Sequence, residues 1–405
     1  MIATNVGKEL ERGLDISIIS FVEALIEDAY HMRASDIHLE PDEGDVKIRF
    51  RIDGVLQDVQ IFPRAMYAEA LSRIKILAHL RTDEHQTAQD GRFRYELRED
   101  KKPIDVRVSV VPTFHEENTV MRLLADQEEE FTLEGLGFSE ENRKKLINAI
   151  RRPYGMILAT GPTGSGKTTT LYTLLKMLNT RSVSIITIED PVEYAVTGIK
   201  QIQVNPRTGL NFASGLRSIL RQDPNIIMVG EIRDEETAGI AVNTSLTGHL
   251  LLSTLHTNDA ATTLPRLLDM KIESYLVAST VNVAIGQRLV RRICQQCKAE
   301  KKITAAERES LTEVLPKNTE KLDGKFFYGK GCEACNDSGY YGRIGIHEVL
   351  VVDDEIREAI LKKASANDIK AIAMKNGMTT MVESGFEKAH SGETTLEEIM
   401  RVIHE

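Results

Sequence analysis

The 405-residue sequence lacks several features that define whole classes of protein. It has no apolar run near the roughly 18 residues that span a bilayer, which excludes a membrane-spanning role. Four cysteines are too few for a disulfide framework in so long a chain. The first ten residues lack the basic start and apolar stretch of a secretion signal. We therefore expect the protein to stay in a reducing cytoplasm.

Positive charge and aromatic side chains are also scarce. The chain has 51 Lys and Arg against 61 Asp and Glu, a formal net charge of −10, and only 5% aromatic residues. No basic segment is interleaved with residues that could stack on bases, so we expect no stable nucleic-acid binding. The sequence shows no internal repeat and no low-complexity tract. At about 100 to 200 residues per domain, its length predicts two to four domains.

The N-terminal third combines helical periodicity with strand alternation. Apolar residues recur at helical spacing over residues 17–33, and a second helix is expected from Pro63 to about Leu80. Alternating apolar and polar residues predict strands at 46–57, 104–110 and 120–124, the first containing a tight turn at Asp53 and Gly54. We predict a small α/β domain over residues 1–130, with the charged stretch 126–130 as a linker.

The pattern then changes to short apolar runs separated by helical segments. The runs are residues 156–159, 184–188, 226–229 and 250–253. Such runs are typical of strands buried on both faces of a parallel sheet, so residues 131–291 are expected to form a doubly wound α/β core. A cysteine-containing module is expected at 292–347. Helical patterns predict a C-terminal helical domain at 348–405.

One glycine-rich segment lies between the first of these runs and a helical stretch. It comprises Gly161, Pro162, Thr163, Gly164, Ser165, Gly166, Lys167, Thr168 and Thr169. Glycines allow successive backbone N–H groups to curl around phosphate oxygens, and the following helix start adds partial positive charge. We expect Lys167 to bridge the β- and γ-phosphates of ATP and Thr168 to offer its hydroxyl to Mg²⁺. The segment predicts a nucleotide-binding loop; an ordinary strand-to-helix turn is the structural alternative.

Acidic residues follow two of the predicted strands. Glu189 and Asp190 end one run, and Glu231 follows another. Ligands of open parallel sheets bind outside the carboxyl ends of the strands, so these carboxylates should face the phosphate loop. We predict that Glu231 polarises the attacking water, while Glu189 and Asp190 position Mg²⁺ through its water shell. The alternative is that such acids cap helices or are simply solvated.

These motifs together resemble those of the type II secretion and type IV pilus assembly ATPases. The matching segments are TIEDPVEY (187–194), LRQDPNIIMVGEIRD (220–234), GHLLLSTLHTNDA (248–260), SDIHLEP (35–41), RFRIDGVL (49–56) and QDGRF (89–93). The resemblance covers nearly the whole chain and implies a RecA-like P-loop core. It also implies a homohexameric cytoplasmic motor, docked on an inner-membrane platform protein, that hydrolyses ATP to drive assembly of pilin-like subunits.

The resemblance also implies roles for individual residues. It gives Walker A roles to Lys167 and Thr168, an acidic box to Glu189 and Asp190, and the catalytic glutamate to Glu231. It implies a histidine box with His249 and His256 that senses the γ-phosphate. N-terminal-domain arginines, here Arg49 and Arg51, are implied to close over the nucleotide, and Arg217 and Arg221 to lie near subunit boundaries. We assign catalytic roles to Arg51 and Arg217 among them.

The sequence departs from the family pattern in two places. Long family members carry a further N-terminal domain, whereas here the SDIHLEP segment begins after only 34 residues. Either the chain is a shortened piece or the protein is a short member. The family's Walker B region usually has an acid where this chain has Asn225. Because that position precedes the predicted strand, we expect catalysis to survive the change.

All four cysteines occur as two C-x-x-C pairs. Cys294, Cys297, Cys332 and Cys335 lie within 42 residues, with 34 residues between the pairs. Each pair can present two thiolates to one tetrahedral Zn²⁺, and four thiolates leave no open position for water. We therefore predict a structural zinc site; four reduced free thiols are the alternative. Family members of the assembly type carry this insertion and retraction ATPases generally lack it, which favours assembly or export.

Two readings from other functional classes compete with the ATPase motor. A hexameric nucleic-acid translocase shares this type of core, but the acidic charge balance argues against it. A nucleotide-gated scaffold would bind ATP without turning it over, and Glu231 argues against that reading. The sequence does not separate protein secretion from pilus assembly or DNA uptake.

Overall fold

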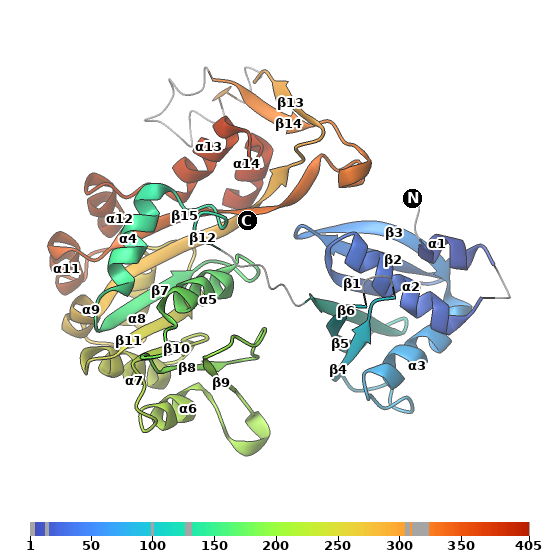
Figure 1. Cartoon of the computed structure of the whole chain (residues 1–405), viewed down its shortest axis with the longest axis horizontal. Helices are drawn as coiled ribbons and strands as arrows, with labels where there is room; N and C mark the ends of the chain where they lie inside the picture. The colour runs from blue at the N-terminus through green and yellow to red at the C-terminus, as the bar shows by residue number, and fades with distance from the viewer. Residues whose placement is uncertain are drawn as a thin grey trace. The chain divides into compact units, whose positions relative to one another are not determined.

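The computed structural model describes residues 5–12, 16–98, 101–125, 132–303, 308–309 and 324–404. It forms two compact units, residues 1–129 and 130–405, which Figure 1 shows in blue to teal and in green to red. The predicted linker at 126–130 lies outside the described residues. Within the described part of the chain, the helices are all too short or too polar to cross a membrane.

The first unit is an antiparallel sheet covered by helices. The strands are β1 (Ala34–Pro41), β2 (Asp45–Ile52), β3 (Val55–Pro63), β4 (Gln89–Glu96), β5 (Pro103–Pro112) and β6 (Glu117–Ala125), and the helices are α1 (Asn5–Leu10), α2 (Ile18–His31), the 3-10 helix η2 (Arg64–Met66) and α3 (Tyr67–Leu77). The strand order is β3-β2-β1-β6-β5-β4. Alternate residues of β5, such as Val106 and Val108, are buried in a core shared with α2 and α3. The alternation therefore leaves the opposite, polar residues on the other face.

The second unit is built on a seven-stranded sheet. Its strands are β7 (Gly155–Thr160), β8 (Ile185–Glu189), β9 (Lys200–Gln203), β10 (Ile226–Val229), β11 (Leu250–Leu255), β12 (Val281–Ile293) and β15 (Tyr340–Val351), in the order β15-β12-β7-β11-β10-β8-β9. Only the β12 and β15 pair is antiparallel. The four predicted core strands are confirmed as β7, β8, β10 and β11.

Helices cover both faces of this sheet. They are α4 (Glu140–Ile150), α5 (Lys167–Leu178), α6 (Phe212–Ile219), α7 (Glu235–Leu246), α8 (Thr263–Asp269) and α9 (Ser274–Thr280), while the short 3-10 helix η3 (Pro206–Thr208) buries no residue. Within β7, Met156 and Leu158 join one buried cluster with α6 and α7, whereas Ile157 and Ala159 join another with α4 and α5. Successive side chains of one strand thus enter opposite cores, which explains why the run is apolar throughout.

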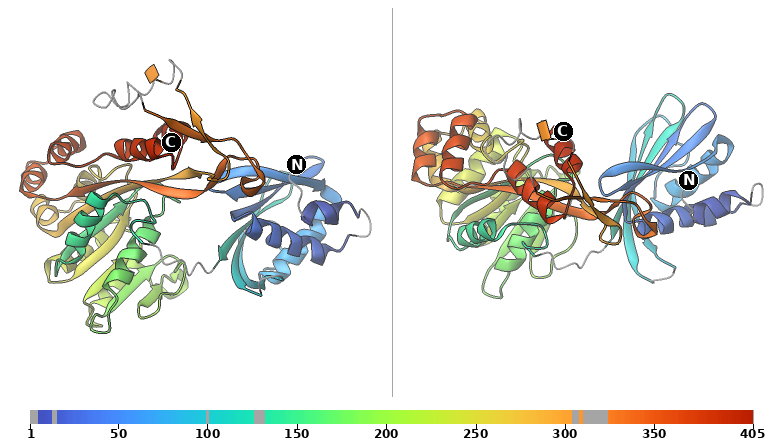
Figure 2. Two further views of the ribbon diagram at one scale, coloured as in Figure 1. Left: turned by 45° about the horizontal axis from the view of Figure 1, so that its top comes forward. Right: turned by 90° about the horizontal axis from the view of Figure 1, so that it is seen from above.

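The C-terminal part extends from the long β12 and β15 pair, which Figure 2 shows in yellow to orange. The remaining elements are β13 (Lys298–Lys301), β14 (Phe326–Gly329), η5 (Glu333–Cys335), α11 (Asp354–Leu361), α12 (Ala366–Lys375), α13 (Met381–Ser391) and α14 (Leu396–His404). The buried carboxylate of Glu398 in α14 binds Arg291 of β12 at 2.7 Å and Arg401 at 2.9 Å. These bonds, together with Arg291 N–H, hold the pKa of Glu398 down to about 2 although burial opposes them. The helical region is thereby fixed to the sheet.

Candidate functional site

The glycine-rich loop connects β7 to α5, as the sequence predicts (Figure 1). Gly161 and Gly166 have φ angles of 141° and 85°, in the region that favours glycine. Lys167 is 9% exposed, and its ammonium donates hydrogen bonds of 2.9 Å to the carbonyl oxygens of Gly161 and Pro162. Burial lowers the pKa of Lys167, and the carboxylate of Glu231 partly opposes that effect. The loop therefore holds one buried cation within the electrostatic reach of Glu231.

Glu231 follows β10 and is 8% exposed. One carboxylate oxygen lies 3.1 Å from Nε2 of His256, and the other lies 2.5 Å from the guanidinium of Arg233. The carboxylate in turn raises the pKa of Arg233. Because β7, β10 and β11 run parallel, the residues that follow them share one edge of the sheet. The structure therefore brings together Lys167, Glu231 and His256.

Threonines connect the phosphate-loop strand to the segment that carries His256. The hydroxyl of Thr160, the last residue of β7, lies 2.7 Å from the carbonyl oxygen of Thr257. The backbone N–H of Thr257 donates to the same hydroxyl oxygen at 2.9 Å. The backbone after β11 is thus fixed directly to the start of the loop.

Arg233 is a contact of Glu231 that our sequence reasoning missed. It lies two residues after Glu231 in a segment that is neither helix nor strand. Residues two apart in an extended backbone project to the same side, which was the available signal. Because the Glu231 carboxylate is shared by Arg233 and His256, each of its two oxygens is held by a partner within this unit.

The two acids at the end of β8 have different surroundings. Glu189 is buried, accepts hydrogen bonds from Tyr172 and from Thr187, and lies 3.2 Å from Nε2 of Gln201. Burial and the Glu189 carboxylate raise the pKa of Tyr172. Asp190, in contrast, is exposed and lies near enough to Arg233 to contribute, after Glu231, to the raised pKa of that guanidinium. Of the pair, Asp190 has the oxygen that is accessible to a metal ion.

Two residues lie at the opposite edge of the sheet. The carbonyl oxygen of His249 accepts from the N–H of Gly155, the first residue of β7, at 3.2 Å. His249 and His256 flank the six residues of β11 and are seven residues apart, about 23 Å at 3.3 Å per residue. The structure therefore does not place His249 with His256. Asn225 binds Ser184 at the starts of β10 and β8, in agreement with the expectation that it precedes the strand.

Arg217 lies in the last turn of α6, and Arg221 follows the helix. Arg217 is half exposed and pairs with Glu236 of α7 at 2.8 Å. The guanidinium of Arg221 donates to the carbonyl oxygen of Arg217 at 3.0 Å. The two arginines thus occupy the α6–α7 surface of this unit.

In the N-terminal unit, Arg51 belongs to a row of arginines. The register pairs Asp36 of β1 with Arg51 of β2 and with Arg122 of β6, and Arg122 with Arg107 of β5. The Asp36 carboxylate lies 2.8 Å from Arg122 and 3.7 Å from Arg51. Directly opposed residues project from one face of a sheet. This polar face therefore holds several guanidinium groups around one carboxylate.

The four cysteine sulfurs gather in one cluster, all within 4.8 Å of one another. The pairs Cys294–Cys332, Cys297–Cys335 and Cys332–Cys335 are 3.8, 3.9 and 3.7 Å apart. Four sulfurs bound about 2.3 Å from a tetrahedral Zn²⁺ would lie about 3.8 Å from one another. The spacing and the sulfur donors therefore fit a closed zinc site.

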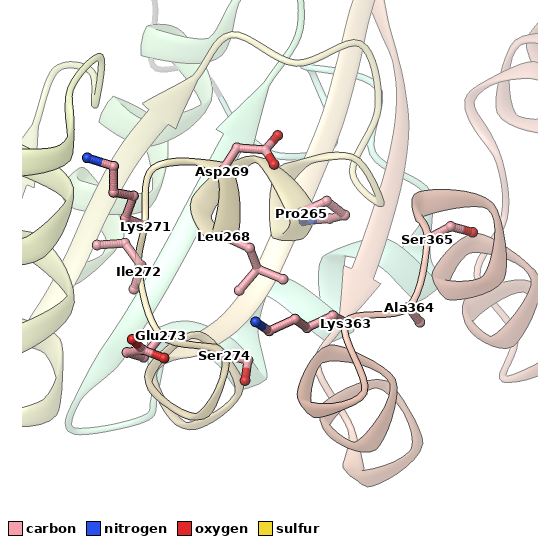
Figure 3. Close-up of a pocket in the computed structure, with 10 residues that line it drawn as sticks. All are labelled: Pro265, Leu268, Asp269, Lys271, Ile272, Glu273, Ser274, Lys363, Ala364 and Ser365. Atoms are coloured by element: carbon pink, nitrogen blue, oxygen red, sulfur yellow. The ribbon is translucent and has the colours of Figure 1, made fainter.

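A separate surface pocket of about 490 Å³ lies between α8, α9 and the segment before α12 (Figure 3). Its described lining residues include Lys271, Glu273 and Lys363, but none of the residues predicted for the nucleotide site. The pocket is therefore distinct from the edge that carries Lys167 and Glu231.

Comparisons with known proteins agree on one family. A family model described as type II/IV secretion system protein matches residues 12–401. The type II secretion system protein E of Xanthomonas campestris is 48% identical over 96% of this chain and 68% of its own length. The type IV pilus assembly ATPase PilB of Thermus thermophilus is 47% identical over 94% of this chain and 42% of its own length. The crystal structure of the pilus retraction motor PilT with bound ADP is 26% identical, with a TM-score of 0.63, over 94% of this chain and 96% of that one.

Proposed function

Because the chain belongs to the type II/IV secretion system protein family, we propose that it is a Mg²⁺-dependent ATPase that powers type II secretion or type IV pilus assembly. The observation that carries this proposal is the position of the Glu231 carboxylate, beside His256 and within electrostatic reach of Lys167. Binding ATP needs only the loop, whereas hydrolysis needs a group that acts on water. Glu231 supplies that group.

The phosphate loop binds and orients the triphosphate. Its backbone N–H groups and the start of α5 stabilise negative charge, and the Lys167 ammonium moves from the loop carbonyls to the β- and γ-phosphates. That exchange leaves the buried cation with anionic partners. The positive charge of Lys167 stabilises the transition state most, because in that state the phosphoryl group separates from its leaving oxygen.

Glu231 accepts the proton of the attacking water as general base. Its carboxylate is oriented on one side by His256 and on the other by Arg233. His256, joined through Thr257 to the end of β7, is suited to report the γ-phosphate to the loop. The half-buried Thr168 and the exposed Asp190 carry oxygen donors of the kind that Mg²⁺ prefers. Mg²⁺, when bound, neutralises charge on the β- and γ-phosphates.

Assembly would complete the site with arginines. We assign Arg51, within its row on the N-terminal unit, and Arg217, on the α6–α7 surface, to the γ-phosphate in the active assembly. A homohexamer provides such arginines from closure or from a neighbouring subunit, so hydrolysis depends on ring formation. The motor would act in the cytoplasm, held at the inner membrane by a platform protein.

Phosphate release by the purified chain tests the proposed activity. We expect turnover with ATP and Mg²⁺, and loss of at least about 90% of it when Mg²⁺ is replaced by excess chelator, because the phosphate charge is then unscreened. Specific activity should rise with protein concentration as rings form. Single-stranded DNA should leave the rate unchanged. A rate that needs DNA would instead support the translocase.

We also propose that Cys294, Cys297, Cys332 and Cys335 hold one structural Zn²⁺. Wild type should contain about one zinc per chain by elemental analysis, and Cys297→Ser, which removes one of four thiolates, should contain less than about a fifth of that. The variant's melting temperature should fall, because the metal stabilises the folded module.

The matched control for this prediction is Tyr328→Phe on the neighbouring strand β14, which leaves the four sulfurs untouched. Its zinc content should equal that of wild type. If wild type contains no zinc and a chelator leaves its melting temperature unchanged, the four cysteines are free thiols.

A further inference from the structure

A buried glutamine on β12 contacts the phosphate loop, although our sequence reasoning assigned it no role. Gln287 is 2% exposed. Its side-chain Nε2 donates a 2.6 Å hydrogen bond to the carbonyl oxygen of Ser165, and its Oε1 accepts a 2.8 Å bond from the hydroxyl of Thr170 in α5. Both ends of the amide are therefore used, one by the loop and one by the helix that follows it.

The Ser165 contact fixes the orientation of a peptide group in the loop. In a trans peptide the C=O and the next N–H point in opposite directions. With the Ser165 carbonyl turned toward Gln287, the N–H of Gly166 points away from β12. That N–H belongs to the residue immediately before Lys167, at the start of α5 where anions bind.

Two of the three glycines of the loop permit this close packing. A Cβ on Gly161 would lie 2.3 Å from the backbone carbonyl oxygen of Gln287, and a Cβ on Gly166 would lie 3.1 Å from its Nε2. The loop thus rests directly on β12 at this residue. A side chain at Gly161 would push the loop away from the strand and from the amide.

We propose that Gln287 is a positioning residue for phosphate binding, holding the Ser165–Gly166 peptide so that the Gly166 N–H faces the phosphates of the nucleotide. The inference rests on the proposed function in that the ligand is ATP or ADP. Gln287 acts through the loop and does not itself contact the substrate. Gln287 supports phosphate binding equally in the ground state and in the transition state. Its replacement should therefore change the affinity for nucleotide more than kcat.

The test is Gln287→Glu, which keeps the size and the oxygen that binds Thr170 but replaces the donor with an oxygen facing the Ser165 carbonyl. We expect the Kd for ADP and the KM for ATP to rise about tenfold, with kcat within about threefold of wild type. Inorganic pyrophosphate, as a competitor for the ADP site, should lose affinity by the same factor because it contacts only the phosphate loop.

Asn282→Asp is the matched control. Asn282 is a buried amide on the same strand, and its Nδ2 donates a 3.0 Å bond to the carbonyl oxygen of Tyr154, away from the loop. The same chemical change there should leave the Kd and KM within about twofold of wild type. If Gln287→Glu does not fold, Thr170→Val removes the hydroxyl that holds the amide, and the Kd should rise about threefold.

The outcomes separate this inference from the proposed function. If wild type binds ADP but does not hydrolyse ATP, the proposed motor function is wrong. The ratio of the Kd for ADP of Gln287→Glu to that of wild type would still decide the role of Gln287. An unchanged Kd in Gln287→Glu, or an equal change in Asn282→Asp, would overturn the positioning role. Wild type that binds no nucleotide would overturn both.

Discussion

Lys167→Ala should reduce the rate of phosphate release by at least about 100-fold at saturating ATP, the size of effect seen when one preorganised charge-stabilising donor is removed. The ammonium is buried inside the loop and held by two backbone carbonyls, which the phosphates replace as its partners when nucleotide binds. Alanine removes the charge without filling the space. We expect zinc content and the melting temperature to stay close to those of wild type.

The control for this variant is Lys176→Ala, at the other end of the same helix. Nine residues separate the two lysines, about 13 Å along the helix axis. Lys176 lies 5.4 Å from the ring centroid of Tyr194 rather than in the loop. Its replacement should leave the rate within about twofold of wild type. Retained ATP hydrolysis in Lys167→Ala would refute the proposed role of Lys167 in binding the phosphates.

Glu231→Gln should lower kcat by about 100- to 10,000-fold, the range contributed by a positioned general base. The amide keeps the size of the carboxylate but does not accept the proton of water. Binding of ADP should stay within about threefold of wild type, because Glu231 acts on water rather than on the bound phosphates. Phosphate release under single-turnover conditions and an ADP titration measure the two quantities.

Glu235→Gln is the matched control for Glu231→Gln. Glu235 begins α7, four residues later, and its carboxylate pairs with Lys271 at 2.7 Å on the surface. An exposed ion pair contributes little, so this variant should behave as wild type. Equal and negligible rates in wild type and Glu231→Gln would favour a nucleotide-gated scaffold over a motor.

Local patterns were sufficient to predict the core strands and the phosphate loop. The run before Gly161 is apolar because its side chains enter cores on both faces of the sheet, and the glycines follow at a fixed spacing. The edge shared by Lys167, Glu231 and His256 also follows from general rules of parallel sheets. These features depend on residues that are close together in the sequence, or on the parallel sheet that apolar runs of this kind predict.

Contacts between distant segments were not predictable in the same way. β12 mixes buried apolar residues with Gly286, Gln287 and several arginines, so neither simple alternation nor an unbroken apolar run marks it. Its partner β15 begins 47 residues after β12 ends. His249 and His256 share one motif, yet a whole strand separates them. The family resemblance groups His249 with His256, two residues that the structure does not bring together within this unit, and our sequence reasoning gave no role to Gln287.

The β12 strand joins two parts of the chain that carry different chemistry. Seven residues lead from Gln287, under the phosphate loop, to the first cysteine, about 23 Å at 3.3 Å per residue. Along that path β12 is hydrogen-bonded to β15, which makes a ribbon instead of a flexible connection. The cysteine cluster and the contact of Gln287 with the phosphate loop therefore lie along one continuous pair of hydrogen-bonded strands.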